Sequence, residues 1–199
     1  RRDAGLGPDA RLVRRRRCEF EIFQSVESAF YAPRIRGPFE SIEPFLALAQ
    51  TLLQSRKARS GKSLELHARE ILVEEGLAAG RDFDHGAVIE DGKRPDFIFP
   101  SRTAYEDPAF PPDRLRMLAV KTTCRDRWRQ ILNEAGRIPR KDLLTLQEGV
   151  SENQFREMTA AGVRLVVPSG LHDAFPKAVQ PRLTSLEAYI GEVRSLAVK

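Results

Sequence analysis

A carboxylate and an ammonium in apolar surroundings are the residues of this sequence best suited to chemistry. Asp96 follows a proline in KRPDFIFP, and Lys121 closes the apolar run RMLAV. A lysine at the end of a buried strand needs a polar partner or an anion, because burying an unpaired ammonium is costly. On neighbouring strands the two groups would meet at one sheet edge, where a divalent metal ion could support phosphodiester hydrolysis. A plain salt bridge is the alternative, and spacing alone favours it.

Other standard catalytic motifs are missing from the sequence. It has no Walker loop, GxGxxG, HExxH, GxSxG or paired CxxC, so we expect no nucleotide cofactor. The histidines at 67, 85 and 172 are widely separated, and we interpret each as a surface or capping residue rather than a metal ligand. Cys18 and Cys124 lack metal-ligand spacing and are expected to be reduced thiols.

Apolar spacing predicts helices in the first part of the chain. Residues 18–31 and 45–57 each repeat apolar side chains every three to four positions, which is typical of amphipathic helices. The RSG at 59–61 predicts a loop. Ser63 can then cap a third helix, whose apolar stripe is flanked by Glu65.

From about residue 83 the pattern changes to strands that alternate with helices. Asp91-Gly92 predicts a hairpin turn before a strand that contains Asp96, and residues 100–114 are expected to form a loop. The later elements are a strand over 116–123, a helix over 124–136, a strand over 142–150, a helix capped by Ser151, a strand over 163–168 and a helix over 183–196. This order favours an α/β fold with a mixed central sheet, preceded by a helical region.

Composition and charge bound the class of protein. The 199 residues are 41% hydrophobic and 31% charged, which is typical of a soluble globular domain. The net charge of +5 comes from residues 1–17 alone, so any nucleic-acid surface on the rest of the chain must be a local patch. No apolar stretch is long enough for a membrane span, and we expect a cytoplasmic protein. The missing initial Met suggests a processed or excised chain; a compact complete enzyme is the alternative.

The segments around Asp96 and Lys121 resemble a known family. The Pro-Asp pair at 95–96 with AVK at 119–121 resembles the PD-(D/E)xK nuclease pattern. The longer segments CEFEIFQSVE, SGKSLELH, KRPDFIFPS and RMLAVKTTCRDRWRQILNEA closely resemble the catalytic domain of EcoRII-type restriction endonucleases, over about residues 14–196. The resemblance implies a PD-(D/E)xK restriction-endonuclease-like α/β/α core. It also implies a metal-dependent, site-specific endonuclease of double-stranded DNA.

The resemblance also implies a set of catalytic residues. The generic motif has an acid two positions before the lysine, where this chain has Ala119. In the family the second acid comes from the following helix, and Glu134 matches it. A further upstream acid corresponds to Glu65. The implied site has Asp96 and Glu134 as Mg²⁺ ligands, Lys121 on the attacking water, and Glu65 in the inner or second coordination shell.

Residues Arg125, Asp126 and Arg127 are chemically equipped to read G·C base pairs. Arginine can donate to guanine O6 and N7, and aspartate can accept from cytosine N4. The triplet follows the catalytic strand and resembles the segment that reads G·C pairs in this family. A solvated helix start with an internal ion pair is the alternative.

The basic run Arg14–Arg17 would ordinarily be a phosphate-binding arm, with disorder as the alternative. Arg16 and Phe20 lie one helical turn apart, so a guanidinium and an aromatic ring can face the same space. Members of the family extrude the central base pair, and a flipped base needs a stacking partner and a donor. Phe20 as part of the hydrophobic core is the alternative.

We therefore expect one catalytic domain with a basic arm (1–17), a helical region (18–80) and an α/β core (81–199). The resemblance implies a bacterial or archaeal homodimer that uses Mg²⁺ and cuts a CCWGG-like sequence (W is A or T) on the 5′ side of the first C. Two alternatives remain. One is a PD-(D/E)xK nuclease with another target, such as a repair or mismatch nuclease. The other is a catalytically idle DNA-binding module.

Overall fold

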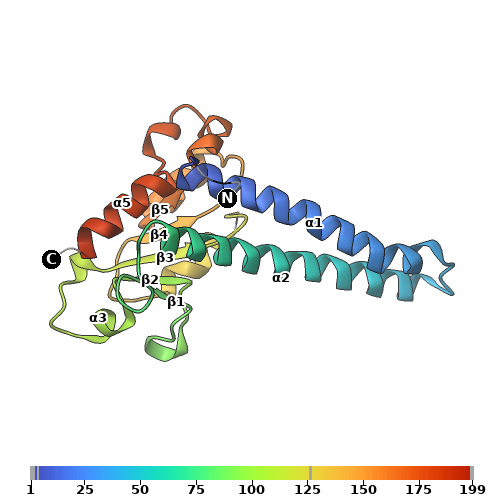
Figure 1. Cartoon of the computed structure of the whole chain (residues 1–199), viewed down its shortest axis with the longest axis horizontal. Helices are drawn as coiled ribbons and strands as arrows, with labels where there is room; N and C mark the ends of the chain where they lie inside the picture. The colour runs from blue at the N-terminus through green and yellow to red at the C-terminus, as the bar shows by residue number, and fades with distance from the viewer. Residues whose placement is uncertain (1–2, 4, 126, 198–199) are drawn as a thin grey trace.

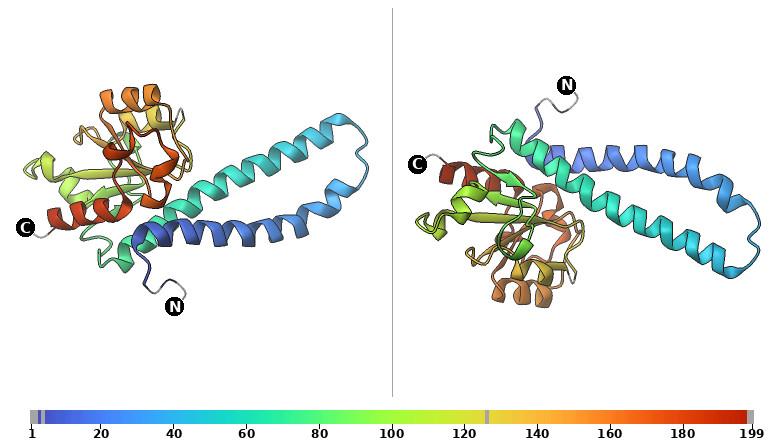
Figure 2. Two further views of the ribbon diagram at one scale, coloured as in Figure 1. Left: turned by 90° about the horizontal axis from the view of Figure 1, so that it is seen from above. Right: turned by 90° about the horizontal axis from the view of Figure 1, so that it is seen from below.

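Two long helices form a hairpin that projects from an α/β body (Figures 1 and 2). The computed structural model describes residues 3, 5–125 and 127–197. Helices α1 (Pro8–Arg36) and α2 (Ile42–Glu74) run side by side along the hairpin, and α1 contacts α5 (Leu186–Ala197) where it joins the body. Within these described ranges, no helix has the length and apolar character needed to cross a membrane.

The body is built on one mixed five-stranded sheet, which confirms the predicted α/β class. The strands lie in chain order: β1 (Asp84–His85), β2 (Phe97–Phe99), β3 (Arg116–Val120), β4 (Lys141–Leu144) and β5 (Val163–Val166). The first three strands pair antiparallel, and β3, β4 and β5 pair parallel. The carboxyl ends of the parallel strands therefore lie along one edge of the sheet, where a site can be assembled.

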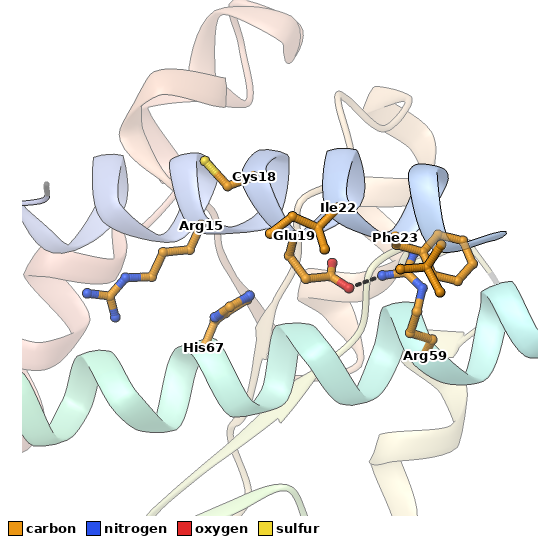
Figure 3. Close-up of a pocket in the computed structure, with 8 residues that line it drawn as sticks. Arg15, Cys18, Glu19, Ile22, Phe23, Arg59 and His67 are labelled. Atoms are coloured by element: carbon orange, nitrogen blue, oxygen red, sulfur yellow. Dashed lines mark hydrogen bonds and ion pairs between the residues drawn. The ribbon is translucent and has the colours of Figure 1, made fainter. Parts of the chain in front are cut away.

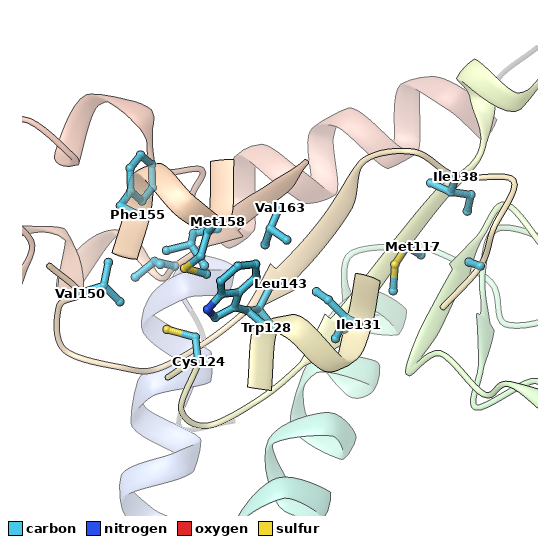
Figure 4. Packing of buried hydrophobic residues seen from close by; sticks show 14 of the residues in the cluster. Met117, Cys124, Trp128, Ile131, Ile138, Leu143, Val150, Phe155, Met158 and Val163 are labelled. Atoms are coloured by element: carbon cyan, nitrogen blue, oxygen red, sulfur yellow. The ribbon is translucent and has the colours of Figure 1, made fainter. Parts of the chain in front are cut away.

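Hydrophobic residues cover both faces of the sheet. One cluster contains Trp128 and Ile131 of the 3₁₀-helix at Arg127–Asn133 and Met158 of α4 (Glu152–Ala160), which pack with Leu143 of β4 (Figure 4). The cluster on the other face joins the ends of α1 and α2 near the body to α5. These two layers give the α/β/α arrangement. Ser151 caps α4 as predicted, because its hydroxyl accepts from the backbone N–H of Gln154.

Several predicted elements differ from the structure. The loop over 59–61 and the helix cap at Ser63 are wrong, because α2 continues without interruption past Gly61 and Ser63. The segment over 127–133 is a 3₁₀-helix rather than an α-helix, and the expected loop over 100–114 contains α3 (Arg102–Glu106). A helical glycine costs about 1 kcal/mol, which the contacts between α1 and the residues beside Gly61 offset: Arg16 donates to Ser60 and Ser63.

The basic run at residues 14–17 lies in α1 rather than in an extended arm. Asp9, in the first turn, is buried and accepts from the backbone N–H groups of Ser169, Leu186 and Glu187. Arg15 donates to Asp3 and Glu74 at 2.8 Å. These contacts anchor the start of α1 to the body, because a buried carboxylate with three donors fixes the backbone around it.

Candidate active site

Asp96 and Lys121 meet at the edge of the sheet, at the start of β2 and the end of β3. Asp96 Oδ2 accepts from Lys121 Nζ at 2.8 Å and from the Val120 N–H at 2.6 Å. The two side chains are 20% exposed or less. The antiparallel pairing of β2 with β3 brings the two residues together across 25 positions of sequence. One carboxylate oxygen is thus held by two donors beside a partly buried ammonium.

Glu134 comes to the same site from the end of the 3₁₀-helix. Its Oε2 is buried and has no hydrogen-bond partner among the described residues. Burial raises the pKa of Glu134; the Lys121 ammonium opposes this effect and the Asp96 carboxylate adds to it. Glu134 therefore lies within electrostatic reach of both Asp96 and Lys121. The structure brings these three predicted site residues together.

Glu65, on α2, is held by Lys62 and by a histidine of β1. Its Oε1 accepts from Lys62 Nζ at 2.8 Å and lies 2.5 Å from His85 Nε2. Burial would raise the pKa of Glu65, but Lys62 and His85 outweigh it and lower the pKa. The His85 ring stacks on Phe97, the residue after Asp96, with ring centroids 5.0 Å apart. His85 thus connects the acid on α2 to the strand that begins at the site.

The interpretation of every histidine as a surface or capping residue is wrong for two of them. The His85 side chain is 18% exposed and contacts Glu65. His67 points between α1 and α2, with Nε2 buried and without a hydrogen-bond partner in the described chain (Figure 3). Both histidines lie between segments that are distant in sequence, so no local sequence pattern predicts their surroundings.

The donor chemistry of the site fits a hard divalent cation. Among the described residues no three His, Cys, Asp or Glu side chains already form a cluster suited to a metal ion. The Asp96 carboxylate nevertheless lies close enough to raise the pKa of Glu134, and one buried oxygen of Glu134 has no partner among the described residues. Carboxylate oxygens are the ligands that Mg²⁺ prefers. A cation would supply the partner that Glu134 lacks.

Two glutamines hold the start of the predicted DNA-reading segment. Gln147 Oε1 accepts from the backbone N–H of Cys124 at 2.8 Å, and Gln154 Nε2 donates to the Arg125 carbonyl at 3.0 Å. The side chains of Arg125 and Arg127 are exposed. Asp126 lies outside the described residues. The reading segment therefore begins on a fixed backbone with its arginines in solvent. The sequence analysis did not identify either glutamine.

Arg16 and Phe20 both lie on α1, and Arg16 contacts α2. The Arg16 guanidinium donates to Ser63 at 3.1 Å and to Ser60 at 2.8 Å, and it pairs with Glu19 at 2.5 Å. Burial lowers the pKa of Arg16. Phe20 is 45% exposed, so its assignment to the hydrophobic core is wrong for this chain. Arg16 is fixed, whereas the Phe20 ring is open to a partner.

A groove between the two helices is lined in part by Glu19, the ion-pair partner of Arg16 (Figure 3). It encloses about 440 Å³ and is lined by Arg15, Cys18, Glu19, Ile22, Phe23, Val26, Arg59 and His67. Glu19 accepts from Arg59, whose guanidinium lies 3.6 Å from the centre of the Phe23 ring. The walls of the groove are thus fixed by contacts between α1 and α2.

The sheet and its covering layers define a restriction-endonuclease-like α/β/α domain. Two solved structures share this fold, metal-depleted Ecl18kI in complex with uncleaved DNA and with uncleaved, modified DNA. Each superposes with a TM-score of 0.75 at 22% identity, over 96% of this chain and 69–70% of the other. At that identity the likeness shows the fold.

The chain belongs to the EcoRII C-terminal family. The family described as EcoRII C terminal matches residues 23–190. The type II restriction enzyme EcoRII from Escherichia coli is 53% identical over 191 residues. That match covers 96% of this chain and 46% of the relative, so the chain spans about half the length of the curated relative. The predicted family is confirmed.

Proposed function

We propose that this chain is a metal-dependent, site-specific endonuclease that hydrolyses phosphodiester bonds of double-stranded DNA. The observation that carries the proposal is the Asp96–Lys121 contact at one sheet edge, with Glu134 within electrostatic reach of both and one buried Glu134 oxygen that no hydrogen bond from a described residue reaches. A salt bridge alone explains the Asp96–Lys121 contact but gives no reason for a buried carboxylate oxygen without a described partner nearby. Such a carboxylate is costly unless a function retains it.

The three side chains have different roles in the proposed reaction. Asp96 and Glu134 would hold Mg²⁺, which supplies positive charge to the scissile phosphate when bound. Lys121 Nζ, fixed by Asp96, donates to the attacking water and orients it. Glu65 supports the site through His85 and Lys62. Asp96 and Lys121 are each 20% exposed or less, and this partial burial strengthens their charge interaction.

Recognition is assigned to residues outside this group. We propose that Arg125, Asp126 and Arg127 read G·C pairs of a CCWGG-like target in the major groove. The anchoring by Gln147 and Gln154 supports the role, because a reading segment must start from a fixed backbone. We propose further that Phe20 stacks on a flipped central base and that Arg16 contacts the edge or neighbouring phosphate of that base.

A concerted cut of both strands requires two sites related by a two-fold axis, so we propose a homodimer. The cytoplasm of a bacterium or archaeon is its proposed location. A nuclease of the same superfamily with another target is the second candidate, because fold and catalytic group do not fix the bases that are read. Mapping the ends left on digested genomic DNA separates the two candidates.

Two substitutions that remove the charge of a side chain but keep its approximate shape test the nuclease proposal. Asp96→Asn and Lys121→Met should each lower Mg²⁺-dependent cleavage of a CCWGG duplex by at least about 10²-fold, the size typical of lost acid–base or charge catalysis. Both should still bind that duplex, because neither side chain reads bases. Lys177→Met, at an exposed lysine, is the control.

Wild-type cleavage by Asp96→Asn or Lys121→Met would show that the site is misplaced. A wild-type chain that binds the duplex but never nicks it with Mg²⁺ would instead identify an idle DNA-binding module.

A further inference from the structure

The backbone that carries Glu134 turns sharply and is held by charged side chains on three sides. Ala135 has a φ of 48°, in the left-handed region that residues other than glycine rarely adopt. Ala135 is also fully buried. Because no hydrogen bond from a described residue reaches the buried Glu134 oxygen, the position of this carboxylate depends on the turn over residues 134–138.

Lys141 holds that turn through three hydrogen bonds from its ammonium group. Its Nζ donates to the carbonyls of Glu134 at 2.5 Å, Ala135 at 2.8 Å and Ile138 at 2.6 Å. The three bonds use all three donors of the ammonium. Lys141 is only 4% exposed and begins β4, the strand paired with the one that leads to Lys121. The lysine therefore ties the Glu134 backbone to the centre of the sheet.

Glu90 holds the same turn through the backbone N–H of Gly136. Its Oε1 accepts from the Gly136 N–H at 2.5 Å, and its Oε2 accepts from the Tyr105 hydroxyl. A side chain at Gly136 would place its Cβ 3.0 Å from that carboxylate, so glycine permits the close approach. Burial, with the Glu90 contact, raises the pKa of Tyr105 to about 12, so the hydroxyl stays a donor.

Lys141 and Glu90 also act on each other through charge. Burial lowers the pKa of Lys141, and the carboxylates of Glu90 and Glu134 oppose that effect. Arg137 completes the arrangement by donating to the carbonyls of Tyr105, Asp107 at 2.8 Å and Phe110 at 2.9 Å. A turn that only connected two elements would not need a buried ammonium and a half-buried carboxylate of opposite charge.

We propose that Lys141 and Glu90 are positioning residues for Glu134. They hold the 134–138 turn so that the Glu134 carboxylate faces Asp96 in the arrangement that binds the metal ion. The inference rests on the proposed function, because it assigns the turn a role in metal affinity. Neither residue touches the reacting atoms. Partners that orient metal-binding side chains typically change metal affinity by about 10–100-fold when removed.

The experiment measures metal affinity separately from stability. Lys141→Met removes the three donors at similar length, and Arg164→Met is the matched control, because Arg164 is in the buried ion pair with Asp142 on the same sheet and has no contact with the turn. We would measure binding of Ca²⁺, as a non-cleaving probe, by calorimetry on the protein–duplex complex. The Mg²⁺ concentration for half-maximal cleavage and the melting temperature would be measured alongside.

Lys141→Met should weaken Ca²⁺ binding and raise the half-maximal Mg²⁺ concentration by at least about 10-fold, with recovery of cleavage at high Mg²⁺. Arg164→Met should lower the melting temperature with unchanged metal affinity. If Lys141→Met loses stability only, at wild-type Ca²⁺ affinity, the two residues are structural anchors and the inference is wrong.

A second pair of variants covers the case in which Lys141→Met does not fold. Glu90→Ala removes the acceptor of the Gly136 N–H and should weaken Ca²⁺ binding in the same way, whereas Glu90→Gln keeps an acceptor oxygen and should restore most of the affinity. Equal Ca²⁺ affinity for both variants and the wild type would overturn the inference while leaving the nuclease intact. A wild-type chain without metal-dependent cleavage or Ca²⁺ binding overturns the proposed function itself.

Discussion

Two carboxylates at the candidate site have opposite environments. Asp96 has two donors on one oxygen, whereas the half-buried Glu134 has one buried oxygen that no described donor reaches. An unsatisfied buried carboxylate lowers the stability of the metal-free protein. The Glu134 carboxylate therefore destabilises the metal-free protein, and a bound cation would offset this effect.

That difference predicts that Glu134→Gln increases the stability of the protein in a pH-dependent manner. The folded-state pKa of Glu134 is raised above its unfolded value by burial, so its charged form opposes folding at pH values above both. Without divalent metal at pH 8, Glu134→Gln should raise the melting temperature by about 2–4 °C, equivalent to about 1 kcal/mol in a domain of this size. The gain should disappear at about pH 4, where the wild-type carboxyl is protonated. Calorimetry at both values checks this, and an equal gain at both pH values would contradict it.

The proposed function gives the arginines two different roles, base reading and contact with the DNA backbone. Arg17 is 81% exposed on α1, whereas Arg15 is engaged with Asp3 and Glu74. Arg127→Ala should cost about 1–3 kcal/mol of discrimination at a G·C pair. Arg17→Ala should weaken binding to all duplexes and reduce the salt slope by about 0.9. Titrations on specific and random duplexes at several salt concentrations compare the two, and equal losses on both duplexes for Arg127→Ala would exclude a reading role.

The exposed ring of Phe20 predicts a fluorescence result. A 2-aminopurine at the centre of the target should brighten when the protein extrudes it. Stacking on Phe20 should partly quench that signal, so Phe20→Ala should raise the fluorescence. The same change should weaken binding by about 1–3 kcal/mol, as for other base–aromatic contacts. A probe that stays dark at saturating protein would exclude flipping. Phe30→Ala, another exposed ring on α1, is the control.

Some site residues were readable in the sequence and others were not. Asp96 and Lys121 follow from strand ends, because neighbouring strands bring their termini together. Glu134 came only from the family resemblance, since Ala119 breaks the generic motif. His85 and Lys141 carry no local signal. Their partners lie on helix α2 or in an irregular turn, and contacts of that kind depend on tertiary packing.

At the scale of elements, the alternating strand pattern was more informative than the helical one. Buried strands such as β3 are short apolar runs between breakers, and their position follows directly from the sequence. The predicted loop at 59–61 is wrong because the prediction rested on the local preference of Gly61 for loops. In the hairpin, contacts of Arg16 with Ser60 and Ser63 on either side of this glycine outweigh that preference.

The continuous α2 predicts that Gly61→Ala stabilises the protein. A Cβ at this position meets no atom within 4 Å, and the backbone is helical. The gain should be up to about 1 kcal/mol, or about 2–4 °C in melting temperature. Gly76→Ala is the control and should destabilise, because Gly76 has a φ of 86°. A loss of stability in Gly61→Ala would favour the loop over the continuous helix.

At the scale of the whole molecule, the hairpin leaves a large apolar surface uncovered. Apolar side chains at its outer half are 48–69% exposed, namely Ile22, Val26, Phe30, Ile35, Ile42, Phe45, Leu46 and Leu53. A groove of about 270 Å³ near the tip is lined entirely by apolar residues. A patch of this kind is unusual on a soluble monomer and typical of an interface. The proposed two-fold symmetric cut requires a second copy, and this hairpin surface is available to bind one.

Charge placed on that surface should therefore separate the subunits. The double variant Val26→Asp, Leu53→Asp should have the mass of one 22.5 kDa chain by light scattering, where the wild type has twice that mass. Val88→Asp, at an exposed valine outside the hairpin, should leave the dimer intact. Because one subunit carries one site, the monomeric variant should nick supercoiled DNA in place of concerted double-strand cuts. A wild type that stays monomeric on its duplex yet cuts both strands together would contradict the dimer, since one site cannot reach two antiparallel strands at once.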